Sequence, residues 1–163
     1  MRYYILLVVI ILFHNCIYAQ LYDGTIDGAM PGKLKDVVAH FEKKGYRKLR
    51  CPECSTSILF MEGQINKREN LQDTVTIYMV KDNLDSTNIK SVSLYYQNEY
   101  DTLINQFKTH KKIFFNSFGR PSQEEKTQSR WIFLNYTYTI GYEGYNLYHK
   151  VEVNKSFRDE ERE

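Results

Sequence analysis

The sequence predicts an α+β fold in which two tandem units, each a helix followed by an antiparallel meander, form one sheet with the helices on one face. An amphipathic pattern over residues 31–44 precedes four strand-like segments. A second such pattern over 99–118 precedes three more. Because the order of elements repeats while the residues do not match, we expect the halves to cover about 25–97 and 98–153 of a single domain, 20–153.

The first helix has both a start and a stop signal. Two Asp-Gly turn signals, at Asp23 and Asp27, precede it. Pro31 suits the first helical turn, where its missing N–H costs no hydrogen bond, and Gly45 is typical of the position after a helix. The apolar stripe at helical spacing consists of Leu34, Val37, Val38 and Phe41. This stripe predicts that the helix over 31–44 buries one face.

Alternation of apolar and polar residues predicts the strands of the first unit. The segments cover residues 46–50, 58–65, 74–80 and 89–96. In the third segment Val75, Ile77 and Met79 share one face, because successive side chains of a strand point to opposite faces. Polar links at 66–73 and 81–88 are typical of hairpin loops. The first unit is therefore expected to be a four-stranded meander.

The second unit repeats this order. The helix over 99–118 carries apolar residues on one side and is stopped by Gly119 and Pro121. After a polar loop at 122–129, three strands are expected. They cover residues 130–135, 136–142 and 145–153. The mostly charged tail, 154–163, is expected to be frayed.

An export signal is indicated by the first residues, MRYYILLVVIILFHNCIYAQ. Arg2 precedes an apolar run that ends at Phe13, and Ala19 offers a small residue for cleavage. The run is shorter than the about 20 residues that span a bilayer. We expect a signal peptide over 1–19, whose removal leaves 144 of the 163 residues as a periplasmic or secreted protein. Lipid anchoring at Cys16 is the alternative, which the bulky and polar residues before this cysteine disfavour.

Charge and composition exclude some classes of partner. Outside the expected signal peptide the chain has 21 basic and 20 acidic side chains, since Arg2 is the only charged residue within it. This balance gives no electrostatic footprint for nucleic acid, and no apolar run predicts a membrane span. Aromatic residues are abundant, with 14 Tyr, 9 Phe and 1 Trp. Tyrosine favours half-buried sheet positions and contact surfaces.

Cys51 and Cys54 are the only cysteines left after removal of the expected signal peptide. An even pair in an oxidising compartment usually forms a disulfide. Here it would close a small loop between two strands and stabilise the fold by about 2 kcal/mol. A thiol–disulfide exchange site is the alternative. Such sites place the first cysteine at a helix N-terminus, whereas the residues after Cys54 favour a strand.

Known catalytic and metal-binding motifs are absent from the sequence. His40, His110 and His149 are isolated and match no metal-ligand spacing. A zinc site at Cys51 and Cys54 would need four ligands, and no second pair lies at a suitable spacing. Neither a nucleophile elbow nor a phosphate-binding glycine loop is found. We therefore expect no cofactor, no metal and no enzymatic activity.

An aromatic contact patch is the strongest candidate for a binding site. Helices can cover only one face of the sheet, and tyrosine-rich open faces are common at protein interfaces and sugar-binding sites. The expected contact residues are Trp131, Tyr136, Tyr138 and Tyr142, followed by Tyr95 and Tyr96. Cross-strand packing within the sheet is the structural alternative for some of them.

A looser pattern concerns covalent modification. Three triplets that begin with aspartate resemble an O-glycosylation acceptor pattern of some gut bacterial periplasms. The candidate acceptors are Thr74, Ser86 and Thr102. A glycan is bulky and solubilising, so only exposed acceptors could carry one.

Several turn motifs resemble a known family. The matching residues are Ile26, Asp27 and Gly28 before the first helix, Lys44, Gly45 and Tyr46 at its end, Phe118, Gly119 and Pro121 after the second helix, and Trp131 at the start of the last meander. In these the chain resembles uncharacterised small secreted proteins of Gram-negative gut bacteria. Their layout is similar to the β-lactamase-inhibitor-protein-like fold, with two helix-plus-sheet repeats and an open face. The resemblance implies protein binding and brings no catalytic residues.

The sequence thus predicts a non-catalytic exported protein that binds another envelope protein through an aromatic sheet face. Two alternatives stay open at this point. The same aromatic residues could bind a glycan or a small ligand in a concave pocket. Cys51 and Cys54 could instead form a thiol–disulfide oxidoreductase site.

Overall fold

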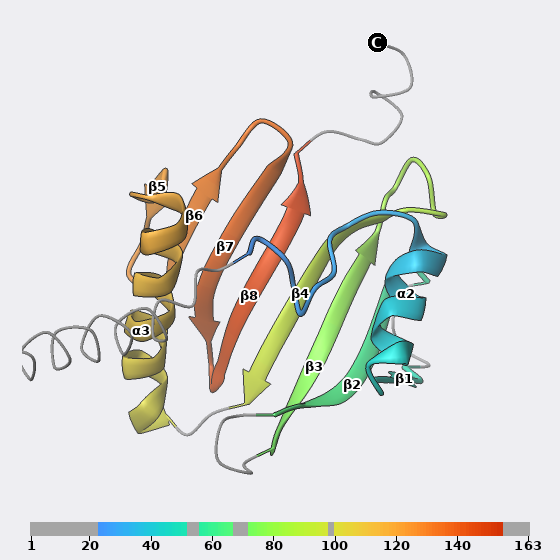
Figure 1. Cartoon of the computed structure of the whole chain (residues 1–163), viewed down its shortest axis with the longest axis horizontal. Coiled ribbons are helices and arrows are strands. Elements are labelled where there is room, and N and C mark those ends of the chain that lie inside the picture. The colour runs from blue at the N-terminus through green and yellow to red at the C-terminus, as the bar shows by residue number, and fades with distance from the viewer. Residues whose placement is uncertain (1–22, 52–55, 67–71, 98–99, 155–163) are drawn as a thin grey trace, which may run out of the picture.

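The computed structural model describes residues 23–51, 56–66, 72–97 and 100–154 (Figure 1). Within them the chain forms two helices and one eight-stranded antiparallel sheet, which is an α+β fold dominated by the sheet. The expected signal peptide at 1–19, Cys54 and the expected tail beyond Asn154 lie outside the described residues.

Each helix precedes four strands along the chain. The first half contains α2 (Leu34–Lys43), β1 (Arg47–Leu49), β2 (Ile58–Asn66), β3 (Gln72–Lys81) and β4 (Ile89–Gln97). The second half contains α3 (Tyr100–Phe118), β5 (Gln123–Glu124), β6 (Gln128–Ile132), β7 (Tyr136–Glu143) and β8 (Asn146–Val153). The strands lie in the order β1-β2-β3-β4-β8-β7-β6-β5, so the pairing of β4 with β8 joins the two halves.

Both helices lie on the same face of the sheet (Figure 1). The apolar stripe predicted for the first helix is its buried side, where Val37, Val38 and Phe41 pack on β2, β3 and β4. The corresponding residues of α3 form a second apolar cluster with β6, β7 and β8. They are Leu103, Phe107 and Phe114. The covered face of the sheet therefore contains the apolar core.

Three elements differ from the sequence prediction. β6 covers Gln128–Ile132 rather than 130–135, because the chain turns at Phe133, whose N–H donates to the Tyr136 carbonyl at 2.9 Å. α2 begins at Leu34 rather than near Pro31. The Gly32 carbonyl accepts a hydrogen bond of 2.7 Å from the backbone of Ile89, and Leu34 N donates to the Thr87 carbonyl at 2.7 Å. The segment before the helix is thus paired with the loop between β3 and β4. The sequence does not predict β5, because its two residues are polar and exposed.

Residues 23–29, called here the N-terminal turn, pass between the two helices in front of β4 and β8 (Figure 1). Ile26 and Ala29 exchange two backbone hydrogen bonds, of 2.8 and 2.9 Å. Between them, Asp27 and Gly28 have φ values of 49° and 84°. These are the positive values of a type I′ turn, for which Asp-Gly is a preferred sequence. The turn places Ile26 in the core, where it is 1% exposed.

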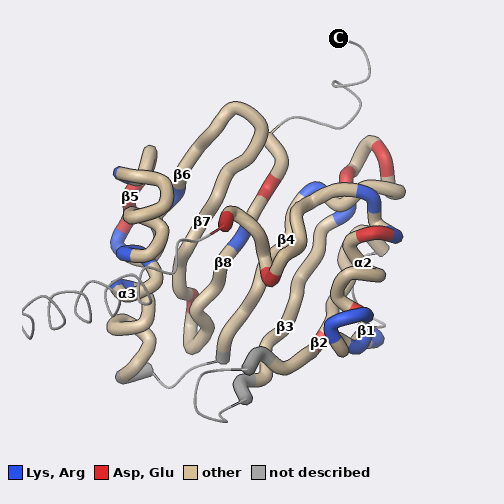
Figure 2. Tube along the Cα trace, viewed as in Figure 1, with Lys and Arg blue, Asp and Glu red and all other residues tan. Residues whose placement is uncertain are grey.

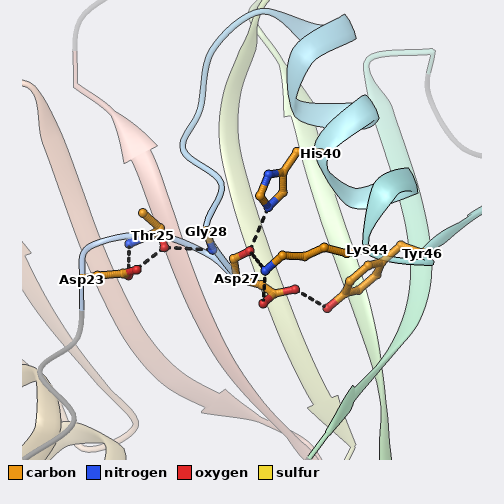
Figure 3. A network of polar contacts seen from close by, with 7 residues as sticks. All are labelled: Asp23, Thr25, Asp27, Gly28, His40, Lys44 and Tyr46. Carbon is orange, nitrogen blue, oxygen red and sulfur yellow. Dashed lines mark hydrogen bonds and ion pairs between the residues drawn. The ribbon is translucent and has the colours of Figure 1, made fainter.

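Asp27 ties the N-terminal turn to α2 and to the residues just after it (Figure 3). Lys44 Nζ lies 2.8 Å from Asp27 Oδ1 and 2.6 Å from the Asp27 carbonyl oxygen. His40 Nε2 contacts the same carbonyl oxygen at 2.9 Å, and the Tyr46 hydroxyl donates to Asp27 Oδ2 at 3.0 Å. Burial, followed by the Asp27 carboxylate, raises the pKa of Tyr46, so its hydroxyl stays protonated and remains a donor.

Replacing Ile26 with alanine is expected to lower the free energy of unfolding by about 2–5 kcal/mol, because the change leaves a cavity between the two helices. Chemical denaturation measures this loss. The matched control is Ile104→Ala, at a position on α3 that is 39% exposed. The control should cost less than about 1 kcal/mol. Equal losses in the two variants would contradict the role given to the N-terminal turn.

Candidate binding surface

The face of the sheet opposite the helices, called here the open face, has no helix or loop of the described residues above it (Figure 1). Its side chains alternate along each strand with those of the core. Antiparallel pairing aligns them in rows across the strands. One row runs through Thr76, Tyr95, Tyr148, Gly141 and Gln128, and the next through Phe60, Tyr78, Ser93, Lys150, Thr139 and Arg130.

Four aromatic side chains, called here the aromatic row, form a continuous series on the open face. The ring centroids of Phe60 and Tyr78 are 5.0 Å apart, and those of Tyr78 and Tyr95 are 6.3 Å apart, both edge to face. Tyr95 and Tyr148 stack at 5.6 Å with an interplanar angle of 30°. Because the four rings come from four adjacent strands and hold one another in place, they present a rigid surface.

Two hydroxyls of the aromatic row, those of Tyr95 and Tyr148, are neutral near pH 7. Burial raises the pKa of Tyr95, and the neighbouring Tyr148 and Glu143 raise it further. Burial also raises the pKa of Tyr148, an effect that the Arg130 guanidinium opposes. The row therefore offers hydrogen-bonding hydroxyls and apolar rings rather than charge.

A groove, called here the β7 groove, runs along β7 beside the aromatic row. Its floor is formed by the short side chains of Thr137 and Thr139, and its volume is about 460 Å³. Longer side chains of the two neighbouring strands form the walls. They are Gln128, Arg130 and Ile132 of β6 and Tyr148, Lys150 and Glu152 of β8. The groove results from short residues on one strand between long residues on the strands beside it.

Tyr148 closes one end of the β7 groove. Its hydroxyl donates to Gln128 Oε1 at 3.3 Å across β7. The crossing requires Gly141, since a Cβ there would lie 2.6 Å from the Tyr148 hydroxyl oxygen. Arg130 Nη2 donates to the same Gln128 oxygen at 3.3 Å, while Gln128 Nε2 donates to Glu125 at 2.6 Å. The Gln128 amide thus orients Arg130 and Tyr148 together.

The β7 groove has an excess of positive charge. Lys150 and Glu152, the two charged residues of β8 (Figure 2), are paired at 2.5 Å, and Lys90 lies 3.8 Å from the same carboxylate. No carboxylate of the described residues forms an ion pair with Arg130. Three cations and one carboxylate therefore line the groove, and their summed field favours an anion.

Trp131, the first of the expected contact residues, lies in the core rather than on the open face. It is 1% exposed, and its Nε1 donates to the Gly119 carbonyl at 2.9 Å. Its ring packs against Phe114 and Phe118 of α3, at centroid distances of 5.2 and 6.4 Å. A residue so enclosed has almost no surface to offer a partner.

The expected contact tyrosines of β7 also lie on the helix-covered face. Tyr136, Tyr138 and Tyr142 alternate with the open-face residues and share their side of the strand with the fully buried Ile140. Tyr96 on β4 has the same orientation. Together with Tyr138 it packs against both apolar clusters. These two tyrosines therefore join the two halves of the core, which corrects their expected place on an open surface.

Tyr95 is the expected contact residue that the structure brings to the open face. Its neighbours Phe60, Tyr78 and Tyr148 are not among the contact residues expected from the sequence. Strand alternation could have placed Tyr78 opposite the apolar residues of β3, because that pattern is regular. Arg130 could not be found in this way, since its position beside the groove depends on how β6, β7 and β8 pair.

A histidine pair, with His149 buried and His110 half-buried, lies between α3 and the covered face of the sheet. His110 Nδ1 and His149 Nε2 are 2.8 Å apart. The rings of Tyr96 and Phe114 pack around His149, which is 6% exposed. Burial, followed by the neighbouring His110, holds the pKa of His149 well below its usual range. The ring is therefore neutral in the folded protein and belongs to the core.

The remaining expected sites are the disulfide and the glycosylation acceptors. Cys51 is exposed after β1, and its expected disulfide partner Cys54 lies outside the described residues, so the disulfide stays a prediction. Thr74, Ser86 and Thr102 are exposed, as glycosylation requires, and their modification stays a prediction. Within the described part of the chain, no group of three His, Cys, Asp or Glu side chains could hold a metal ion. Neither helix of that part has the length and apolar character needed to cross a membrane.

Comparisons with protein families, with curated proteins and with solved structures find no match to this chain. The resemblance to small secreted proteins, which rests on turn motifs, stays an expectation.

His149→Phe is expected to reduce the pH dependence of stability in mild acid. Because folding lowers the pKa of His149, the unfolded chain binds this proton more readily, and the free energy of unfolding falls as the pH drops below about 6.5. Phenylalanine keeps the packing against Phe114 and cannot titrate. Denaturation between about pH 7.5 and about pH 5 measures the difference. If the free energy of unfolding fell equally with pH in the variant and the wild type, the lowered pKa of His149 would not be the source of the pH dependence.

Proposed function

We propose that the chain is an exported, non-catalytic protein that binds another envelope protein through the open face of its sheet. The observation that carries the proposal is the aromatic row, in which four half-buried rings from adjacent strands lie on a face without a covering element of the described residues. Rigid aromatic side chains dominate binding hot spots, because they contribute large contact areas at little cost in conformational entropy.

The dimensions of the row suit a protein interface. It extends over four strands, and three strand spacings amount to about 14 Å. The β7 groove lies beside it and supplies charged and hydrogen-bonding side chains. An apolar centre with a polar rim is the usual composition of such an interface.

We further infer that the fold consists of two tandem units. A helix followed by four strands occurs twice along the chain. The strand order is symmetric about the boundary between β4 and β8, with β1 and β5 at the two edges. The proposed export rests on the pattern of residues 1–19, and it places the partner in the envelope or outside the cell.

A glycan or small ligand is the second candidate, and the β7 groove favours it. A concavity of about 460 Å³ falls within the size range of ligand pockets, and its polar walls could bind hydroxyl groups. For thiol–disulfide exchange at Cys51 and Cys54, the described residues supply no additional argument.

The test is a crosslinked pull-down of the tagged protein from the envelope of its native host, with two double variants. Tyr78→Thr combined with Tyr95→Thr removes two rings of the aromatic row and keeps a residue type that suits strands. The yield of the specific partner protein is expected to fall at least about tenfold, since rings at the centre of an interface carry most of its binding energy.

The control makes the same exchange on the covered face, with Tyr136→Thr combined with Tyr142→Thr. Partner yield should be kept in this control once circular dichroism shows that both double variants are folded. Loss of the partner in the control alone would move the contact surface to the helix-covered face. Background alone with the folded wild-type protein would favour the glycan alternative.

A further inference from the structure

We infer that the β7 groove binds an extended acidic peptide segment of the protein partner, with a carboxylate of that segment on Arg130. This inference rests on the proposed function, because it names the chemistry of the partner that the open face binds. Three observations carry it: the width of the groove, its excess of positive charge, and the exposed apolar residues at one end.

The β7 groove is about as wide as one extended chain. Its walls stand on β6 and β8 with β7 between them, so the wall strands are about 10 Å apart. Thr137 and Thr139 are short and lie below the walls, and Thr139 is 6% exposed. The Thr137 hydroxyl donates to Asn154 Oδ1 at 2.6 Å, and its oxygen can still accept a hydrogen bond. A single extended segment can enter such a groove, whereas a rounded protein surface cannot reach its floor.

Arg130 supplies the anchor for an anion. Its guanidinium has five N–H donors, and the structure directs Nη2 to Gln128. That bond fixes the orientation of the guanidinium plane and leaves further donors for a carboxylate, whose two oxygens match the planar group. Thr139 is in register with Arg130 on one side and Lys150 on the other. A carboxylate above Thr139 would therefore meet a cation on each wall.

Apolar residues continue the surface at the end of the groove opposite Tyr148. Ile132, which lines the groove, is 46% exposed, and Leu134 in the adjoining hairpin tip is 80% exposed. The ring of Phe133 instead packs against Phe118 and Tyr138 on the covered face. The backbone of this hairpin tip is fixed, because Asn154 Nδ2 donates to the Phe133 carbonyl at 2.5 Å and Asn154 N donates to the Asn135 carbonyl at 2.9 Å. Exposed apolar residues on an ordered backbone typically mark a contact site.

The order of these features along the β7 groove specifies the ligand. A carboxylate at Arg130 and an aliphatic side chain at Ile132 are two positions apart along the strand, which is about 7 Å. Because successive side chains of an extended peptide point to opposite sides, a peptide with an acidic residue two positions from an aliphatic one satisfies both. A sugar acid could satisfy Arg130, but its hydroxyl groups would find no partners among the apolar side chains of the tip. The peptide is therefore favoured, and the sugar acid becomes one arm of the test.

The experiment is a titration of the purified protein followed by NMR chemical shifts. The probes are the pentapeptide acetyl-Ala-Glu-Ala-Leu-Ala-amide, its counterpart with glutamine in place of glutamate, and glucuronate. The amide signals of Thr139 and Lys150 report on the groove. We expect the glutamate peptide to bind at least about tenfold more tightly than the glutamine peptide, because only the former carries the charge that Arg130 recognises.

Two variants at Arg130 and one control variant test whether Arg130 causes the difference in affinity between the two peptides. Arg130→Gln should abolish the difference between the two peptides, while Arg130→Lys, which keeps the charge and loses the planar fork, should retain part of it. Lys112→Gln makes the same change in net charge at an exposed position on α3, across the sheet from the groove. It should leave the difference intact. A peptide preference that survives Arg130→Gln would overturn the inference, as would glucuronate binding to the groove more tightly than the glutamate peptide.

The pull-down separates this inference from the proposed function. One outcome is that the Arg130→Gln variant retains the envelope partner that the double variant Tyr78→Thr with Tyr95→Thr loses. In that case the open face binds the partner, and the inferred carboxylate contact with Arg130 is wrong. If Arg130→Gln also lowers the yield of that partner at least about tenfold, while Lys112→Gln does not, the anchor is supported in the natural complex.

Discussion

The pairing of β4 with β8 is the interaction on which the rest of the structure depends. Seven pairs of residues, from Ser91 with Glu152 to Gln97 with Asn146, join two meanders that are otherwise separate along the chain. Because the pairing is antiparallel and in register, the two meanders become one sheet with two continuous faces. Both helices occupy one of these faces. The other is left to present side chains from strands that are far apart in sequence.

On the covered face, the two separate helices leave space above the central strands β4 and β8. The N-terminal turn fills that space with Ile26, and Asp27 holds the turn to the residues just after α2 through Lys44 and Tyr46. Tyr96 and Tyr138 complete the contact between the two apolar clusters. Tyrosines that look like a contact surface in the sequence are thus needed to join the halves of the core.

The sequence predicts the elements of this fold better than it predicts their faces. Helical spacing and strand alternation locate both helices and seven of the eight strands, because these signals are local. Ile140 lies between Tyr138 and Tyr142 on the same side of β7, and its apolar character marks that side as core. The β7 groove is a property of three paired strands. Its walls approach only through the register of β6, β7 and β8, which no local pattern encodes.

Hydroxyl-radical footprinting of the protein alone and with its captured partner tests the open-face account most directly. The method reports the solvent exposure of individual tyrosine rings. The account predicts that the tyrosines of the aromatic row lose reactivity when the partner binds, while Tyr136 and Tyr142 on the covered face keep theirs. Protection of the β7 tyrosines with an unprotected aromatic row would contradict it, since the partner would then contact the side of the sheet that carries the helices.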